Sequence, residues 1–259
     1  SAAIFACELS KKEKNDKVFF VTFAAVIMLP TVILNSAYWG QCDSIYTTFI
    51  ILTLLYLYRE KYHRAFMFLG IAFAFKMQTI FIFPFIICFY IYKKQFSIFE
   101  LLITVFTFWI SGIGAFVQGR SLLDPFRIYA NQTGTYQYMH VNFPSFWMFV
   151  GNDYEWLKTA AIVMAAGICG MGLYIIMKRK LDCSRPENFV SIASWFIWTC
   201  VLFLPAMHER YAYPLEILLV ILTCINKDYL KYSSVAILFS LFTYGNYLFS
   251  NGGLDKYIV

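Results

Sequence analysis

The stretch from Ala65 to Tyr92, AFMFLGIAFAFKMQTIFIFPFIICFYIY, is apolar almost throughout and carries one charged residue, Lys76. An apolar run of this length is typical of a membrane-embedded segment. It predicts either one long tilted helix or two short helices that meet at Lys76-Met77-Gln78. Because a lone lysine at the middle of a membrane is costly, we expect two short helices with Lys76 at the corner between them.

The distribution of basic residues favours the same interpretation. Lysine and arginine accumulate in the cytoplasmic loops of membrane proteins. With two helices in 65–92, most of the 21 Lys and Arg residues fall on one side of the membrane, whereas a single helix makes the split more even. The polar stretches near 38–43, 76–78 and 207–211 and the loop 119–157 then share the outer side. Polar residues beside one leaflet predict a reaction or binding site at that membrane surface.

The composition of the whole chain predicts a membrane protein. Of its 259 residues, 60% are hydrophobic and only 14% are charged, with a mean hydropathy of +0.62. A soluble domain has about a quarter charged residues, which it needs for a polar surface. We therefore expect an all-α, polytopic integral membrane helix bundle that forms a single transmembrane domain over residues 1–259. The net charge of +6 lies in short loops and indicates topology, so no nucleic-acid partner is expected.

Apolar runs separated by charged residues predict about nine membrane segments. They are 18–34, 44–58, 65–75, 78–92, 97–118, 158–177, 189–206, 211–225 and 232–249. The long outer loop 119–157 is too aromatic for disorder, and we expect a short helix from Phe143 to Val150 to lie on the membrane surface. Gly167, Gly170 and Gly172 would allow close helix packing.

The cysteines predict neither a disulfide framework nor a metal site. All seven are scattered singly, and no His/Cys cluster has the spacing of metal ligands. We therefore assign no metal-ligating residue, and a divalent cation is the one cofactor left open.

The first polar motif is the stretch NSAYWGQCD, residues 35–43, which ends one apolar segment and opens the next. One interpretation is a capped turn, with Asp43 as the N-cap of a helix from Ser44 and Trp39 as an interfacial anchor. The other is functional. Asn35, Gln41 and Asp43 exceed what a turn needs, and they could hold sugar hydroxyls.

Two further motifs carry charge. Lys76 and Gln78 stand at the expected corner, where the lysine either extends to the membrane surface or meets a phosphate. The second is His208-Glu209-Arg210, followed by Tyr211, between two apolar segments. Ionisable residues at such a position indicate function by default, the alternative being an Arg–Glu pair that joins two helices.

These strings together resemble a known family. WGQCD at 39–43, KMQ at 76–78 before FIFP at 81–84, and MHERY at 207–211 are similar to bacterial membrane glycosyltransferases of the GT-C superfamily, relatives of the second mannosyltransferase of GPI-anchor synthesis. Their order and spacing agree across roughly residues 20–225. The resemblance implies a GT-C-like fold in a bacterial plasma membrane. It also implies transfer of mannose or another hexose, with inversion, from a polyprenyl-phosphate donor to a glycan or lipid acceptor at the outer or lumenal face.

Members of this family usually carry a catalytic acidic residue in the first outer loop. The present chain opens with an apolar stretch and the charged run 11–17, which resembles the end of a helix whose start is missing. The resemblance therefore predicts an N-terminally truncated member, with Asp43 as the remaining candidate for the base, a metal ligand or an orienting group.

The resemblance and the chemistry together assign the expected site. The expected catalytic residues are Asp43, His208, Glu209 and Arg210. The expected substrate-binding residues are Asn35, Trp39, Gln41, Lys76, Gln78 and Tyr211. Lys76 and Arg210 would stabilise the departing phosphate, because transfer needs positive charge there. Two alternatives remain: a transporter or flippase of a lipid-linked sugar, whose usual repeated halves are not evident, and an inactive fragment without the first loop.

Overall fold

The computed structural model describes residues 1–10, 16–132 and 135–249, and within them the chain is all α-helical. The main helices are α1 (Ala2–Leu9), α2 (Asp16–Ile27), α3 (Pro30–Val32), α4 (Asp43–Tyr58), α5 (Tyr62–Phe75), α6 (Phe83–Lys93), α7 (Glu100–Ile110), α8 (Ile113–Val117), α9 (Asp124–Gln132), α10 (Tyr154–Lys178), α11 (Pro186–Phe203), α12 (Tyr213–Ile225) and α13 (Leu230–Phe249). Short turns of other helix types are η1 (Ile33–Tyr38), η2 (Met77–Ile82), η3 (Phe146–Phe149) and η4 (Lys227–Tyr229). Part of the charged run 11–17 lies outside the described residues.

The break at Lys76 is confirmed. α5 ends at Phe75, Lys76 is extended with φ −159° and ψ 131°, and the chain turns through η2 before α6 begins. Pro84 stands in the first turn of α6, where its missing N–H would have no helical partner in any case. The stretch 65–92 is therefore two helices with the charged residue at the corner.

The expected number of nine membrane segments is wrong by length and composition. Each expected segment is helical, but among the described residues only α10 is long and apolar enough to cross a membrane. A second crossing results if α2 and the stretch Pro30–Tyr38, bent by 51°, count as one span. For the shorter helices the reason is length. α4, α5, α7 and α12 have 10–17 residues, so they rise about 15–26 Å, less than the ~30 Å hydrocarbon core.

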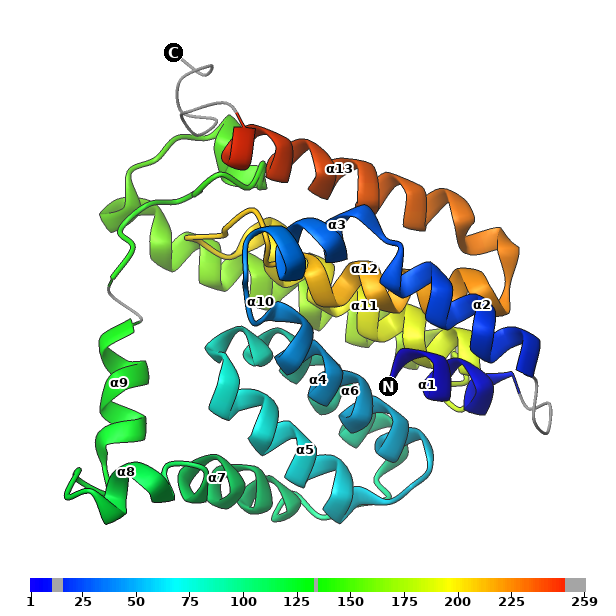
Figure 1. Ribbon diagram of the computed structural model, residues 1–259, viewed down its shortest axis with the longest axis horizontal. Helices are drawn as coiled ribbons and strands as arrows, with labels where there is room; N and C mark the ends of the chain where they lie inside the picture. The colour runs from blue at the N-terminus through cyan, green and yellow to red at the C-terminus, as the bar shows by residue number, and fades with distance from the viewer. Residues whose placement is uncertain (11–15, 133–134, 250–259) are drawn as a thin grey trace.

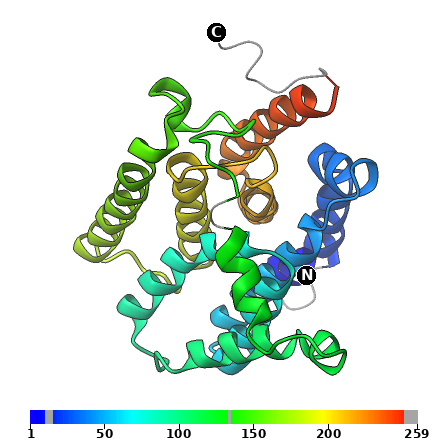
Figure 2. The ribbon, with the colours of Figure 1, turned by 90° about the vertical axis from the view of Figure 1, so that its left-hand side faces the viewer.

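The centre of the molecule is α12, whose residues are buried from Tyr213 through Leu222. It packs against α11, α13, α1, α2 and α4. Figure 1 shows α12 between α11 and α13, with α2 and α3 beside it, while α4, α5 and α7 form a second group of packed helices. Figure 2 shows α8 and α9 extending along one side of this second group. Because α12 is apolar apart from Glu216 over most of its length, its interior position removes a large apolar surface from contact with solvent.

Several outer helices expose large apolar side chains. Exposed examples are Phe20 and Phe23 of α2, Phe106 of α7, Val163 and Met171 of α10, and Leu238 and Phe242 of α13. Soluble proteins expose single apolar residues routinely, but rarely so many on so many helices. The outside of the molecule is therefore apolar over several of its helices.

The loop 119–157 differs from the expectation in two respects. It contains α9, which was not among the expected helices, and its residues 133–134 lie outside the described part. The expected helix at 143–150 is only the single turn η3. Trp147 in that turn is 4% exposed, and its Nε1 donates to the Phe203 carbonyl at 2.7 Å. This turn is thus docked on the end of α11 through Trp147.

Of the three α10 glycines expected to allow close packing, only Gly172 does so. A Cβ at Gly172 would lie 2.3 Å and 2.4 Å from two atoms of the Trp195 ring, whereas Gly167 and Gly170 have nothing within 4 Å. We expect Gly172→Ala to lower the free energy of unfolding by about 1–3 kcal/mol, because the ring must move. The matched Gly170→Ala should leave it unchanged or raise it by up to ~1 kcal/mol, since alanine favours helix. Denaturant titration of both variants in detergent tests this, and equal effects would contradict it.

Candidate functional site

The three polar motifs meet in space. Asp43 opens α4, Lys76 stands at the corner between α5 and η2, and Arg210 lies in the connection between α11 and α12. Lys76 Nζ forms an ion pair with Asp43 Oδ1, and Arg210 Nε lies 3.9 Å from Asp43 Oδ2. Below, the term "charged cluster" means Asp43, Lys76, His208, Glu209 and Arg210. Residues from three separate parts of the chain thus share one site.

The turn before α4 brings Asn35 onto Asp43. Trp39 N donates to the Leu34 carbonyl and Gln41 N to the Asn35 carbonyl, both at 2.9 Å, and Gly40 supplies the left-handed conformation with φ 70°. Folded back in this way, Asn35 donates from Nδ2 to Asp43 Oδ2 at 2.8 Å.

The interpretation of Asp43 as an N-cap is wrong. α4 begins at Asp43 itself, its N-cap position is Cys42, and no side chain caps it. The Asp43 side chain is fully buried, and its two oxygens are bound by Lys76 and Asn35. Asp43 therefore holds together the groups that approach it from other elements.

The Lys76 side chain is held by the same carboxylate. Its ammonium group pairs with a buried carboxylate, 5.5 Å from the centre of the Tyr46 ring. The Lys76 side chain is nevertheless 14% exposed. It can meet a ligand that enters from outside.

Arg210 has the same combination of buried partners and partial exposure. Its Nη1 donates to Glu209 Oε1 at 2.5 Å, and its guanidinium lies 4.9 Å from the centre of the Trp39 ring. The Arg210 side chain is 19% exposed, whereas Glu209 and Asp43 are 0% exposed. The two cations therefore reach the surface of the charged cluster, and the two carboxylates lie behind them.

His208 is almost buried and electrically neutral. Its ring meets Tyr136 edge-on at a centroid distance of 4.6 Å, and its Nδ1 lies 3.9 Å from Glu209 Oε2. Burial, with smaller contributions from Arg210 and Lys76, lowers the pKa of His208 from 6.5 to about 4. Its Nε2 has no hydrogen-bond partner among the described residues. A neutral imidazole with a free nitrogen can accept a proton.

The pKa of Glu209 moves in the other direction. Burial raises the pKa of this carboxyl, and the neighbouring Arg210 opposes the rise. The amide of Asn142 also interacts with the Glu209 side chain. Two residues next to each other in sequence therefore respond oppositely to acid.

The stability of the protein should fall on acidification through His208. Between pH 6.5 and about 4 the unfolded chain binds a proton at this position and the folded chain does not, so lower pH favours unfolding. The loss reaches at most about 1.4 kcal/mol per pH unit and is complete below about pH 4. Because Glu209 acts oppositely, the measurement compares unfolding of the wild type with that of His208→Gln from pH 7.5 to 4. Identical pH profiles would show that His208 contributes nothing.

The remaining expected residues surround the charged cluster. Gln78 interacts with the hydroxyl group of Tyr211, whose ring lies 5.9 Å from that of Phe81. Trp39 stacks on Arg210, as described above. Gln41 is half-buried, and its backbone N–H holds the turn by donating to the Asn35 carbonyl.

Three members of the site were not among the expected site residues. The hydroxyl of Tyr244 on α13 accepts from Asn35 Nδ2 at 2.8 Å, Tyr136 packs on His208, and Asn142, with φ 56°, reaches Glu209. The loop that carries Asn142 is attached to the cluster by backbone pairing, with Val141 N donating to the Met207 carbonyl at 3.1 Å. Tyrosines are common in this chain, so neither tyrosine was distinguishable in advance.

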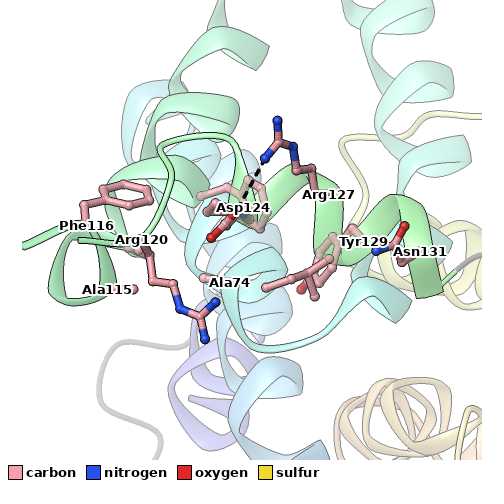
Figure 3. Close-up of a pocket in the computed structure, with 13 residues that line it drawn as sticks. Ala74, Ala115, Phe116, Arg120, Asp124, Arg127, Tyr129 and Asn131 are labelled. Carbon is pink, nitrogen blue, oxygen red and sulfur yellow. Dashed lines mark ion pairs between the residues drawn. The ribbon is translucent and has the colours of Figure 1, made fainter. Parts of the chain in front are cut away.

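Two cavities lie outside the charged cluster. One, of about 420 Å³, is apolar and lies between α6, α10 and α11; Phe81, which contacts Tyr211, is in its wall. The other, of about 690 Å³, lies beside α8 and α9. Figure 3 shows Arg120, Asp124 and Arg127 around it, the last two being 3.8 Å apart. Phe81 thus places the apolar cavity beside Tyr211, the neighbour of Arg210 in sequence.

The described residues contain no group of three or more His, Cys, Asp and Glu side chains placed to hold a metal ion. A comparison of the whole sequence with protein-family models and with curated proteins finds no match. The resemblance to GT-C glycosyltransferases therefore rests on the three motifs.

Proposed function

We propose that this chain is an integral membrane glycosyltransferase of the GT-C type. It transfers a hexose from a polyprenyl-phosphate donor to a glycan or lipid acceptor at the outer or lumenal face of a bacterial plasma membrane. The observation that carries the proposal is the charged cluster. Its two cations, Lys76 and Arg210, are partly exposed, while their carboxylate partners Asp43 and Glu209 are fully buried.

This arrangement supports binding of a phosphate. Lys76 and Arg210 are held in place from behind, so they can meet negative charge without first becoming ordered. When the bond between the sugar C1 and the phosphate oxygen breaks, the phosphate leaves with the electron pair. Positive charge fixed beside that oxygen stabilises the developing anion.

His208 suits the role of proton acceptor better than Asp43. Both oxygens of Asp43 are bound and the side chain is 0% exposed, so Asp43 positions Lys76 and Arg210. His208 is neutral and its Nε2 is free among the described residues. In the proposed reaction the acceptor hydroxyl attacks C1 and its proton passes to His208.

The apolar parts of the molecule support a lipid-linked donor. The 420 Å³ cavity is lined almost entirely by apolar side chains and shares Phe81 with the ring contacts of Tyr211. An isoprenoid chain seated there would leave its phosphate near the charged cluster. The exposed apolar faces of α2, α7, α10 and α13 support a membrane location.

Reconstituted protein tests the proposal directly. The chain is placed in vesicles with a radiolabelled polyprenyl-phosphate mannose or glucose and a lipid-extract acceptor, and labelled product is measured. Product formation supports the proposal. Label that crosses the membrane without chemistry supports a flippase instead. If neither product nor crossing is observed with either donor, both functions are contradicted.

A flippase remains the second candidate because of one observation. α2 and the stretch Pro30–Tyr38 form a helix pair bent by 51° around Pro30. Transporters often build their binding sites at interrupted helices of this kind.

A further inference from the structure

A separate group of buried polar atoms lies where α3, α12 and α13 meet. Glu216 of α12 is 1% exposed, and Thr31 of α3 and Ser240 of α13 are both 0% exposed. The carboxyl of Glu216 interacts with both hydroxyls. Figure 1 shows the three helices side by side, in agreement with the packing of α13 on α3 and on α12.

These side chains are close together but do not satisfy one another. Neither oxygen of Glu216, nor Oγ1 of Thr31, nor Oγ of Ser240 has a hydrogen-bond partner within the described part of the chain. Buried polar groups are nearly always hydrogen-bonded, and an exception needs an explanation. Four unsatisfied oxygens from three helices that face one another indicate a common bound species.

The charge of Glu216 also has no partner. Within the described ranges, no lysine, arginine or histidine lies within ion-pair distance of Glu216. The ionisable groups near its carboxyl are the phenols of Tyr213 and Tyr244. Lys76 and Arg210 are occupied by Asp43 and Glu209. A carboxylate buried without a counter-charge is costly, so it takes up a cation or a proton.

We propose that Glu216, Thr31 and Ser240 form a binding site for a sodium ion. Sodium is a hard cation that binds oxygen ligands, and its single positive charge matches the single carboxylate of Glu216. Protein sites for calcium or magnesium usually contain several carboxylates. One sodium ion can contact all four oxygens and supplies the positive charge that the buried carboxylate lacks. The site adjoins the break at Pro30, and interrupted helices commonly contribute to sodium sites.

The proposal does not depend on the glycosyltransferase function, but it has a consequence for that site. Ser240 and Tyr244 are four residues apart on α13 and therefore share a face. Tyr244 holds Asn35, and Asn35 holds Asp43. A sodium ion at Glu216 would fix α13 against α3 and so stabilise the support of the charged cluster.

Thermal unfolding of the full chain in detergent tests the site. Tm is measured from zero to 100 mM NaCl at constant ionic strength, with choline chloride as the replacement salt. If 100 mM is about ten times the Kd, Tm should rise by about 3–5 °C with sodium. Glu216→Gln and the pair Thr31→Val with Ser240→Ala should remove the rise. Ser194→Ala should keep it, because that buried hydroxyl bonds the Val190 carbonyl of its own helix.

A second measurement covers variants that do not fold. Equilibrium binding of radioactive sodium to the wild type should give about one site per chain, and excess unlabelled sodium should displace the label. No bound sodium, or a Tm that responds to pH but not to sodium, would mean that Glu216 carries a proton and would overturn the proposal. Because this readout involves no sugar, it is separable from any failure of the transferase assay.

Discussion

Arg210→Ala is expected to reduce sugar transfer by at least about 100-fold while the protein still inserts into membranes. Arg210 is the more exposed of the two cations of the charged cluster, and it stacks on Trp39 with its guanidinium 4.9 Å from the ring centre. Its loss removes positive charge where the leaving phosphate would develop its charge. Deleting one preorganised donor at such a position typically costs a factor of 10² to 10³.

The controls for this prediction separate charge from folding. Arg127→Ala removes an arginine that pairs with Asp124 outside the charged cluster, so transfer should be unchanged. Arg210→Lys keeps the positive charge but loses the planar guanidinium that contacts both Glu209 and the Trp39 ring. It should retain part of the activity. Initial rates with labelled donor, together with the amount of folded protein, are the measurements. Wild-type turnover of Arg210→Ala would remove Arg210 from the mechanism.

Asp43→Ala should be the most destabilising substitution in the charged cluster. Asp43 is 0% exposed and binds Lys76 and Asn35, with Arg210 at 3.9 Å. Alanine leaves two cations near each other without this carboxylate. Removing one partner of a buried ion pair costs about 3–5 kcal/mol, so we expect a loss of that size in the free energy of unfolding.

A double variant distinguishes ion pairing from simple loss of contacts. In Asp43→Ala with Lys76→Met no lysine charge is left behind, so part of the stability should return. The matched control is Glu155→Ala, which breaks an exposed pair with Lys158 and should cost no more than about 1 kcal/mol. Denaturant titration in detergent gives all the values. A cost for Asp43→Ala as small as that of Glu155→Ala would show that the buried pair contributes little.

The comparison of Lys76 with Asp43 shows how far local sequence reasoning reached. The corner at Lys76 was predictable because a single charge in an apolar run cannot remain in the middle of a helix inside lipid. The role of Asp43 was not predictable. An aspartate before a helix is usually a cap, and its use as an ion-pair partner depends on a lysine 33 residues away.

The number of membrane segments was also not predictable from the sequence pattern alone. Apolar runs located the helices from α2 through α13 correctly, except α9. Most of these helices are too short to count as membrane spans, because breaks such as those at Pro30 and Lys76 shorten the helices and turn their axes. α9 was missed because its sequence is polar on average, and the docking of Trp147 on α11 depends on a contact with a distant segment.

The amino-acid sequence by itself determined the helical class, the positions of the helices and the residue types at the candidate site, because hydropathy and charge act on each segment locally. Only the tertiary structure decided which polar residues come together: Lys76 with Asp43, Asn35 with Tyr244, and Glu216 beside two hydroxyls from other helices. Pairings of this kind depend on how helices far apart in the chain pack. Burial, which sets the cost of every unpaired charge, exists only after they have packed.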